Sequence, residues 1–110
     1  MSISDQTRKS LEKIGLTSYE TKTYTSLLKN GELTASDLST KSGVPYSKIY
    51  EVLGTLGEKG WIGSDDGRPT KYFAKSPNTG LQTAKHKAET DFSKNEKTIL
   101  NDLGPLYEKT

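Results

Sequence analysis

The sequence lacks the residues that usually crosslink a chain, catalyse reactions or bind metals. None of its 110 residues is a cysteine, which excludes a disulfide framework and a thiolate zinc site and is typical of proteins in a reducing compartment. The single histidine, His86, belongs to no Ser-His-Asp, metal-ligand or phosphate-loop pattern, and we interpret it as a solvated surface residue. We therefore expect no enzyme activity, no metal and no cofactor.

Long hydrophobic runs are also missing. Residues 1–10 contain no apolar signal-peptide segment, and no run of about 18 apolar residues occurs anywhere. We expect a cytoplasmic protein without a membrane span. Only 30% of the residues are hydrophobic and 27% are charged, so the core must be small. The length suits one small domain with one extension, and a thin core favours oligomerisation.

The charge balance is nearly even. The formal net charge is +2, which is compatible both with an ordinary mixed surface and with a weakly basic nucleic-acid-binding protein. Residues 41–75 contain six basic and four acidic residues, which is only a modest basic excess.

Residues 34–60 carry the most informative pattern, because they predict two short helices joined by a tight turn. Thr34 and Asp37 predict the start of a helix over 35–42, with Ala35 and Leu38 facing inward. In the turn, Gly43 can adopt a positive φ, Val44 can fill the core, and Pro45 suits a first helical position. The second helix is predicted over 46–58, with an apolar stripe formed by Ile49, Val52, Leu53 and Leu56.

A hairpin is predicted directly after these helices. Residues 61–63 and 70–75 are β-prone and flank an Asp-Gly-Arg-Pro tip. Residues 31–33 are too short for an independent strand but could pair with the hairpin. Helix, turn, helix and hairpin in this order predict a mainly α fold with a small β-wing, the winged helix-turn-helix. This architecture places one helix in a DNA major groove.

Two further helices are predicted before this pattern. The first covers about 5–14, with Leu11 and Ile14 inward. The second opens with Thr17 and Glu20 as a capping box and runs to about residue 29. On its inner face we expect Tyr24, Leu27 and Leu28 to pack in the core.

Beyond residue 77 the pattern predicts a single long helix. It begins near Asn78 after a Ser-Pro separator and ends before Gly104-Pro105, so we divide the chain into a winged domain over 1–77 and a dimerisation helix with a tail over 78–110. A lone helix of this polarity is marginal in water. Its apolar row can pair with a second copy as a coiled coil or fold back on the helix over 5–14. The predicted dimerisation row is Leu81, Ala84, Ala88, Phe92, Asn95, Ile99 and Leu103, with Leu106 as a further candidate.

At this point three blocks resemble the N-terminal domain of the TrmB-type transcriptional regulators, mostly archaeal winged-helix proteins. They are LEKIGLTSYETKTY (11–24), LTASDLSTKSGVPYSKIYEVLGTLGEKGWI (33–62) and GRPTKYFAKSP (67–77). The resemblance implies a DNA-binding module followed by a dimerising helix. Larger members carry a C-terminal sugar-binding domain. The printed chain ends at Thr110, as expected for either a short effector-free member or a fragment, so sugar sensing is not carried over.

The recognition helix departs from the family at two positions. Gly54 and Gly57 stand where members often have a basic residue and a polar or acidic residue. Each glycine costs roughly 1 kcal/mol relative to alanine in a helix. The pair indicates either close approach of another backbone or a helix that is firm only in its N-terminal half.

Candidate DNA contacts follow from the predicted helix-turn-helix and wing. Serine and lysine side chains can reach phosphates or base edges, and helix N-termini suit phosphates. Glu51 could accept from a cytosine, remain solvated or pair with Lys48, and Tyr50 could pack or contact the DNA backbone. The predicted contacts on the helices are Thr34, Ser36, Tyr46, Ser47, Lys48, Tyr50 and Glu51.

Arg68 and Lys71 are the predicted DNA contacts of the wing. Arg68 lies between a turn glycine and a proline, where it can enter a narrow minor groove or merely neutralise Asp65 or Asp66. Lys71 could contact a phosphate beside it. We expect a homodimeric, sequence-specific transcriptional regulator that binds double-stranded DNA. The alternative is a winged-helix interaction module that docks a protein of the transcription machinery and has little DNA affinity.

Overall fold

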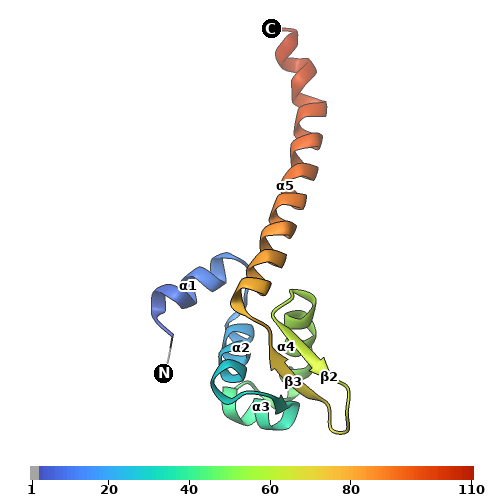
Figure 1. The fold of residues 1–110 in the computed structure, drawn as a ribbon. Coiled ribbons are helices and arrows are strands. Elements are labelled where there is room, and N and C mark those ends of the chain that lie inside the picture. The colour runs from blue at the N-terminus through green and yellow to red at the C-terminus, as the bar shows by residue number, and fades with distance from the viewer. Residues whose placement is uncertain (1–2) are drawn as a thin grey trace.

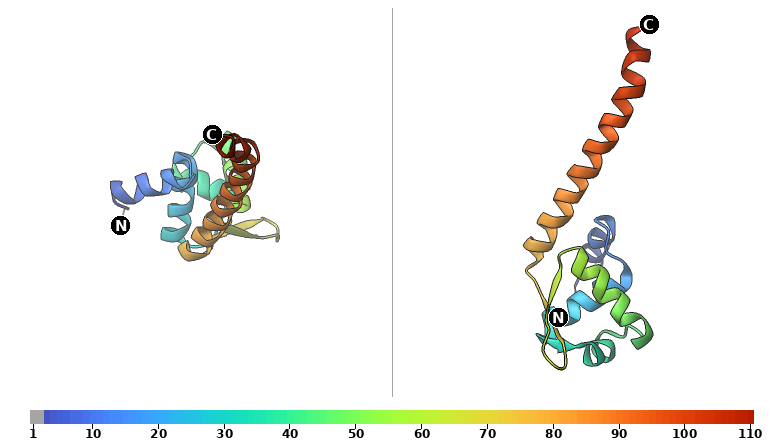
Figure 2. Two further views of the ribbon diagram at one scale, coloured as in Figure 1. Left: turned by 90° about the horizontal axis from the view of Figure 1, so that it is seen from above. Right: turned by 90° about the vertical axis from the view of Figure 1, so that its right-hand side faces the viewer.

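The elements follow one another in the predicted order of a winged helix with an extension. The computed structural model describes residues 3–110, and within them a small helical unit with a three-stranded sheet leads into one long helix (Figures 1 and 2). The elements are α1 (Asp5–Lys13), α2 (Ser18–Asn30), β1 (Leu33–Thr34), α3 (Ala35–Ser42), α4 (Tyr46–Glu58), β2 (Ile62–Asp65), β3 (Lys71–Ala74) and α5 (Pro77–Glu108).

Side-chain caps explain where the early helices begin. The Thr17 hydroxyl accepts from the amide of Glu20 at 3.1 Å, and the Glu20 carboxylate accepts from the amide of Thr17 at 2.8 Å. This reciprocal pair is the predicted capping box. Thr34 caps α3 in the same way by accepting from the amide of Asp37 at 3.2 Å.

The core lies among α2, α3 and α4, under the sheet. Leu27, Leu38, Ile49, Leu56 and Trp61 are each at most 2% exposed. The inward stripe predicted for α4 is confirmed, because all four of its apolar residues are buried. Two inward predictions are wrong, since Leu28 and Ile14 remain 51% and 41% exposed.

The turn between α3 and α4 forms with one difference from the prediction. Gly43 adopts a φ of 79°, which favours glycine, and Val44 is 1% exposed. Pro45 is the N-cap of α4 and not its first helical residue, because its ψ of 141° is extended. Its carbonyl accepts from the amides of Lys48 and Ile49 at 2.9 and 3.1 Å.

The wing is an antiparallel sheet in the order β1-β3-β2. The predicted pairing of the segment before α3 is confirmed, with Leu33 opposite Tyr72 in β3. The first wing strand was predicted to begin at Trp61 and to end at residue 63, whereas β2 begins at Ile62 and extends to Asp65. Trp61 is buried under α5 instead, with its indole against Gly80.

The long helix α5 starts earlier and ends later than predicted. Ser76 caps it by accepting from the amide of Thr79 at 3.2 Å, and Pro77 occupies its first turn, where no intrahelical amide donor is needed. The helix also continues through Gly104 and Pro105 to Glu108, because Pro105 removes only one hydrogen bond and its carbonyl accepts from Lys109.

Both figures show α5 rising from one end of the unit, whereas α3 and the β2–β3 loop lie at the other end (Figures 1 and 2). The long dimension of the molecule is 63 Å. Most of α5 therefore does not fold back on α1, although Leu81, Ala84 and Ala88 in its first turns share a hollow with Lys13 and Ile14 at the end of α1. No helix among residues 3–110 meets the length and hydropathy needed to cross a bilayer.

The first two turns of α5 are fixed to the winged unit by close glycine contacts. Gly80 is buried with its Cα against the Trp61 indole, where a Cβ would overlap the ring. Gly60, with φ 86°, meets Thr83, whose Oγ1 would lie 2.7 Å from a Cβ. The orientation of α5 relative to α4 therefore depends on these contacts.

We expect Gly80→Ala to lower the free energy of unfolding by about 1–3 kcal/mol, because the added methyl group overpacks the Trp61 ring. Gly104→Ala is the matched control in the same helix, since no atom lies within 4 Å of its Cβ position. It should leave stability unchanged or raise it by up to about 1 kcal/mol. Urea unfolding of both variants measures the difference, and equal effects would contradict the packing account.

Candidate nucleic-acid interface

The N-terminal half of α4 presents a polar face to solvent. Tyr46, Ser47, Lys48, Tyr50 and Glu51 are all exposed, while the opposite stripe of the helix is buried. All five were predicted as contacts. The alternation of exposed and buried positions follows from the 3.6-residue period of a helix whose one face forms the core.

Tyr46 and Tyr50 form an aromatic pair on this face. Their rings pack edge to face with centroids 5.7 Å apart, and their hydroxyls lie 3.4 Å apart. Both side chains are more than half exposed, so Tyr50 packs on its neighbour and not in the core. The hydrogen bond with Tyr46 raises the pKa of Tyr50 above its ordinary value. Tyr50 is therefore an uncharged hydroxyl at neutral pH.

A hollow of about 430 Å³ separates α4 from the wing. We call it the wing hollow, and it brings together the predicted Thr34, Ser36 and Tyr50 with Thr70 and Tyr72. The side-chain oxygen of Thr34 already accepts a hydrogen bond there, because it caps α3. Ser36 is exposed in the first turn of α3, where free amide groups favour an anion.

The wing tip holds Arg68 in an exposed position. Within residues 3–110 Arg68 forms no ion pair, so its predicted alternative partners, Asp65 and Asp66, do not neutralise it by contact. Asp66 instead accepts from the Ser64 hydroxyl at 3.3 Å. Lys71 lies directly across the sheet from Asp65, and an opposite charge there reduces the local positive potential.

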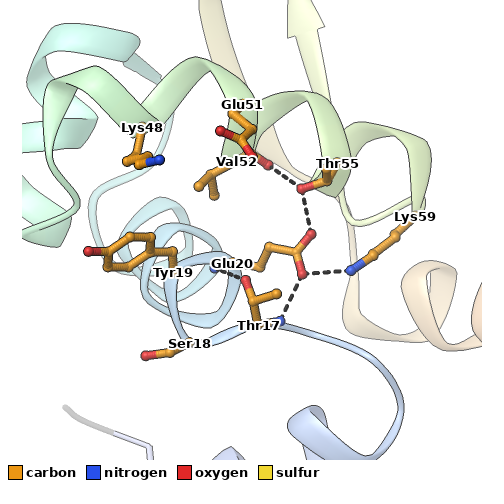
Figure 3. A pocket seen from close by; sticks show the side chains of 9 residues that line it. All are labelled: Thr17, Ser18, Tyr19, Glu20, Lys48, Glu51, Val52, Thr55 and Lys59. Carbon is orange, nitrogen blue, oxygen red and sulfur yellow. Dashed lines mark hydrogen bonds and ion pairs between the residues drawn. The ribbon is translucent and has the colours of Figure 1, made fainter.

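A second hollow of about 420 Å³ lies on the other flank of α4, beside the start of α2 (Figure 3). Lys48, Glu51 and Tyr19 line it, and Figure 3 shows Lys48 above the Tyr19 ring. Lys48 and Glu51 form no ion pair in the described part of the chain. The predicted α4 contacts therefore divide between two flanks of the helix.

Buried Glu20 forms the floor of this second hollow. Its carboxylate accepts from Lys59 Nζ at 2.7 Å, from Thr55 Oγ1 at 2.6 Å and from the Thr17 amide (Figure 3). Burial alone would raise the pKa of Glu20, but these hydrogen bonds and the Lys59 charge outweigh it and lower the pKa below 4.5. Lys59 also donates to the Gly15 carbonyl at 2.8 Å. The network joins the C-terminal end of α4 to the start of α2.

Sequence reasoning missed several residues of the two hollows. Tyr19, Thr70 and Tyr72 line them, but Tyr19 was assigned only to the start of a helix, and Thr70 and Tyr72 only to a wing strand. Only the close approach of distant segments reveals them. Gly54 and Gly57 are exposed, and no other segment among residues 3–110 comes within 4 Å of their Cβ positions, so packing within the described part of the chain does not require glycine there. Residues 3–110 contain no group of side chains suited to hold a metal ion.

The family model described as "Sugar-specific transcriptional regulator TrmB" matches residues 11–78. The chain belongs to the TrmB family. The matched region includes α2, the helix-turn-helix formed by α3 and α4, and the wing. The winged-helix fold and the resemblance inferred from the three sequence blocks are therefore confirmed.

The curated relatives of this chain include proteins named as transcriptional regulators. The chain is 35% identical over 89 residues to the HTH-type sugar sensing transcriptional regulator TrmBL1 of Pyrococcus furiosus, a match that covers 81% of this chain and 26% of that protein. The chain spans 26% of the length of TrmBL1 and 39% of that of the putative regulator TrmBL2, both of Pyrococcus furiosus.

Solved structures agree with the family assignment. The structure of TrmBL2, described as an archaeal chromatin protein with a novel mode of DNA binding, has a TM-score of 0.73 at 27% identity and covers 84% of this chain and 36% of that one. The transcriptional regulator PA4135 has a TM-score of 0.56 at 22% identity, covering 92% of this chain and 79% of that one. The latter match supports the fold alone.

We expect Glu20→Gln to lower the free energy of unfolding at pH 7 by about 1–3 kcal/mol, because it removes a buried charge that Lys59 and two other donors satisfy. The direction in which this stability difference changes with pH follows from the lowered pKa of Glu20. The stabilisation by ionised Glu20 is complete above about pH 4.5 and is lost as pH falls through the lower folded-state pKa.

Glu51→Gln is the matched control for this prediction, since Glu51 lines the same hollow but is exposed. It should change stability by less than about 0.5 kcal/mol. Urea unfolding between pH 3 and pH 7 measures both variants. A Glu20→Gln deficit that does not shrink on acidification would show that Glu20 is not a stabilising anion.

Proposed function

We propose that this chain is a sequence-specific DNA-binding transcriptional regulator that acts as a homodimer. The observation that carries the proposal is the exposed N-terminal half of α4, which stands beside the wing with polar side chains and no covering element. Membership of the TrmB family and the regulators among its relatives support it.

In this proposal α4 enters the major groove. Ser47 and Lys48 then contact phosphates or base edges, and Tyr46 and Tyr50 contact the backbone through their hydroxyl groups. The start of α3, with Ser36, faces a phosphate. Gly54 carries no side chain that would keep the DNA backbone from the helix.

The wing contributes Arg68 to the adjacent minor groove. The side chain is exposed and unpaired among the described residues, so it pays no cost for breaking an ion pair on binding. A guanidinium group suits the negative potential of a narrow minor groove. Lys71 contributes less than a free lysine would, because Asp65 faces it across the sheet.

The proposed dimer forms through α5. Leu81, Phe92, Ile99 and Leu103 are between 45% and 68% exposed, and they fall on the predicted row with Ala84, Ala88 and Asn95. The same end of the helix also exposes Leu100, Leu106 and Tyr107. The 32 residues of this helix span about 48 Å at 1.5 Å each, so pairing this row would remove exposed apolar side chains from water along much of that length.

A symmetric dimer presents two copies of α4. A pseudo-palindromic site is then expected, with half-sites roughly 34 Å apart or a multiple of this spacing. The exposed Glu51 and the acidic pair at the wing tip favour a second candidate, in which the same face docks a protein of the transcription machinery. In that case DNA affinity would be weak and nearly independent of sequence.

The dimer prediction is that Leu103→Asp converts the protein to a monomer, because it places a charge in an apolar seam. The variant should show a mass near 12.1 kDa by light scattering, against twice that value for the natural sequence. Lys97→Asp lies on the opposite side of α5 at 100° per residue and should remain dimeric. If the natural chain is monomeric at micromolar concentration, the proposed pairing of two copies through α5 is refuted.

The DNA prediction is that Arg68→Ala weakens binding to a promoter duplex by about tenfold, or roughly 1–3 kcal/mol. Lys75→Ala, which removes a positive charge directly after β3 and away from the wing tip, should weaken it much less. Titrations of a promoter duplex and a random duplex at several salt concentrations measure both variants. Equal affinities of Arg68→Ala and the natural protein for the promoter would contradict the role of the wing.

A further inference from the structure

A third hollow, on a different part of the surface, collects positive charge from three helices. It has a volume of about 250 Å³, and Arg8 of α1, Lys22 and Lys29 of α2 and Lys41 of α3 line it. We call it the basic hollow. No residue of α4 or of the wing lines it. It is therefore separate from the proposed DNA-reading face.

The charges of the basic hollow are largely uncompensated. Its lining contains no aspartate or glutamate. Arg8 pairs with Asp5, both on the solvent-exposed surface of α1. The three lysines form no ion pair within the described residues. The three unpaired lysines repel one another around one small space, and an anion in that space would relieve the repulsion.

A buried hydroxyl without a partner points to the same place. Thr21 lines the hollow, is 3% exposed, and its Oγ1 has no hydrogen-bond partner among residues 3–110. Buried polar groups are nearly always satisfied, so the Thr21 hydroxyl is available to donate to a group bound in the hollow that reaches it. Ser42, which also lines the hollow, accepts from the Val44 amide and keeps its own proton free to donate.

We propose that the basic hollow binds a phosphate group. Its donors are a guanidinium, three ammonium groups and hydroxyls, arranged on several sides of one space. A phosphate offers oxygens in all these directions and carries up to two negative charges, whereas a carboxylate offers only two coplanar oxygens. The phosphate comes either from a small free molecule or from the backbone of a duplex that extends past the C-terminal end of α3.

Inorganic phosphate is the probe for the test. Thermal unfolding is followed in phosphate and in chloride at equal ionic strength. Phosphate should raise the unfolding temperature of the natural protein, and its titration should shift the amide resonances of Thr21 and Ser42 with saturation. A linear, unsaturated response shared by amides all over the surface would overturn the proposal.

Two triple variants with equal charge loss separate a site from a general counterion effect. Lys22→Gln/Lys29→Gln/Lys41→Gln should bind phosphate at least tenfold more weakly. Lys94→Gln/Lys97→Gln/Lys109→Gln removes three exposed charges of α5 and its C-cap and should bind like the natural protein. Equal loss in both variants would overturn the site.

A second pair of variants keeps charge and shape constant. Thr21→Val and Thr23→Val each remove a buried hydroxyl that has no partner, but only Thr21 lines the hollow. Both should raise the unfolding temperature in chloride, since an unsatisfied group is removed. Only Thr21→Val should reduce the increase that phosphate produces. An equal phosphate response of the two variants would overturn the part assigned to the Thr21 hydroxyl.

Duplex titrations identify the source of the phosphate group. If the DNA backbone supplies it, inorganic phosphate competes with duplex, and the triple variant at the hollow loses one or more phosphate contacts from its salt slope. If a free molecule supplies it, duplex affinity is unchanged in that variant and phosphate binds the protein–DNA complex as well. Phosphate binding that survives when the protein has no DNA affinity would refute the proposed function while the hollow remains a site.

Discussion

The structure depends on the packing of one side chain, Trp61, at the junction of four elements. The indole is 1% exposed and meets the ring of Tyr24 in α2 edge to face at 5.2 Å. Its amide donates to Leu56 of α4, its carbonyl accepts from the amide of Lys75 after β3, and its ring lies against Gly80 of α5. One residue thus fixes both the recognition helix and the projecting helix, so that pairing of two α5 helices would set the spacing of two α4 helices.

Elements with strong end signals could be predicted from the sequence, and those governed by tertiary contacts could not. The bounds of α4 follow from Pro45 before it and Gly60 after it, and the start of α2 follows from its capping box. Trp61 looked like a strand residue because it is β-prone, but the contact with Gly80 draws it into the core. Gly104-Pro105 looked like a helix stop, yet a projecting helix tolerates one missing hydrogen bond there.

The exposure of the candidate DNA-contact residues could be predicted from the sequence, but their grouping on the surface could not. Exposure of Ser47, Lys48 and Glu51 follows from helical periodicity once the buried stripe of α4 is known. Which neighbours they have depends on long-range contacts: Lys48 and Glu51 share a hollow with α2, whereas Tyr50 shares one with α3 and the wing. The basic hollow was invisible in the near-neutral composition, because its cations are spread over residues 8–41 and converge only in the folded chain.

The central claim is that α4, the start of α3 and the wing tip form one DNA-binding face. It is tested most directly by mapping backbone amide shifts of the natural protein during titration with a promoter duplex. The account predicts the largest shifts in residues 34–36, 46–51 and 66–71, with small shifts at the far end of α5. Shifts confined to α5, or no shifts at low salt, would contradict it.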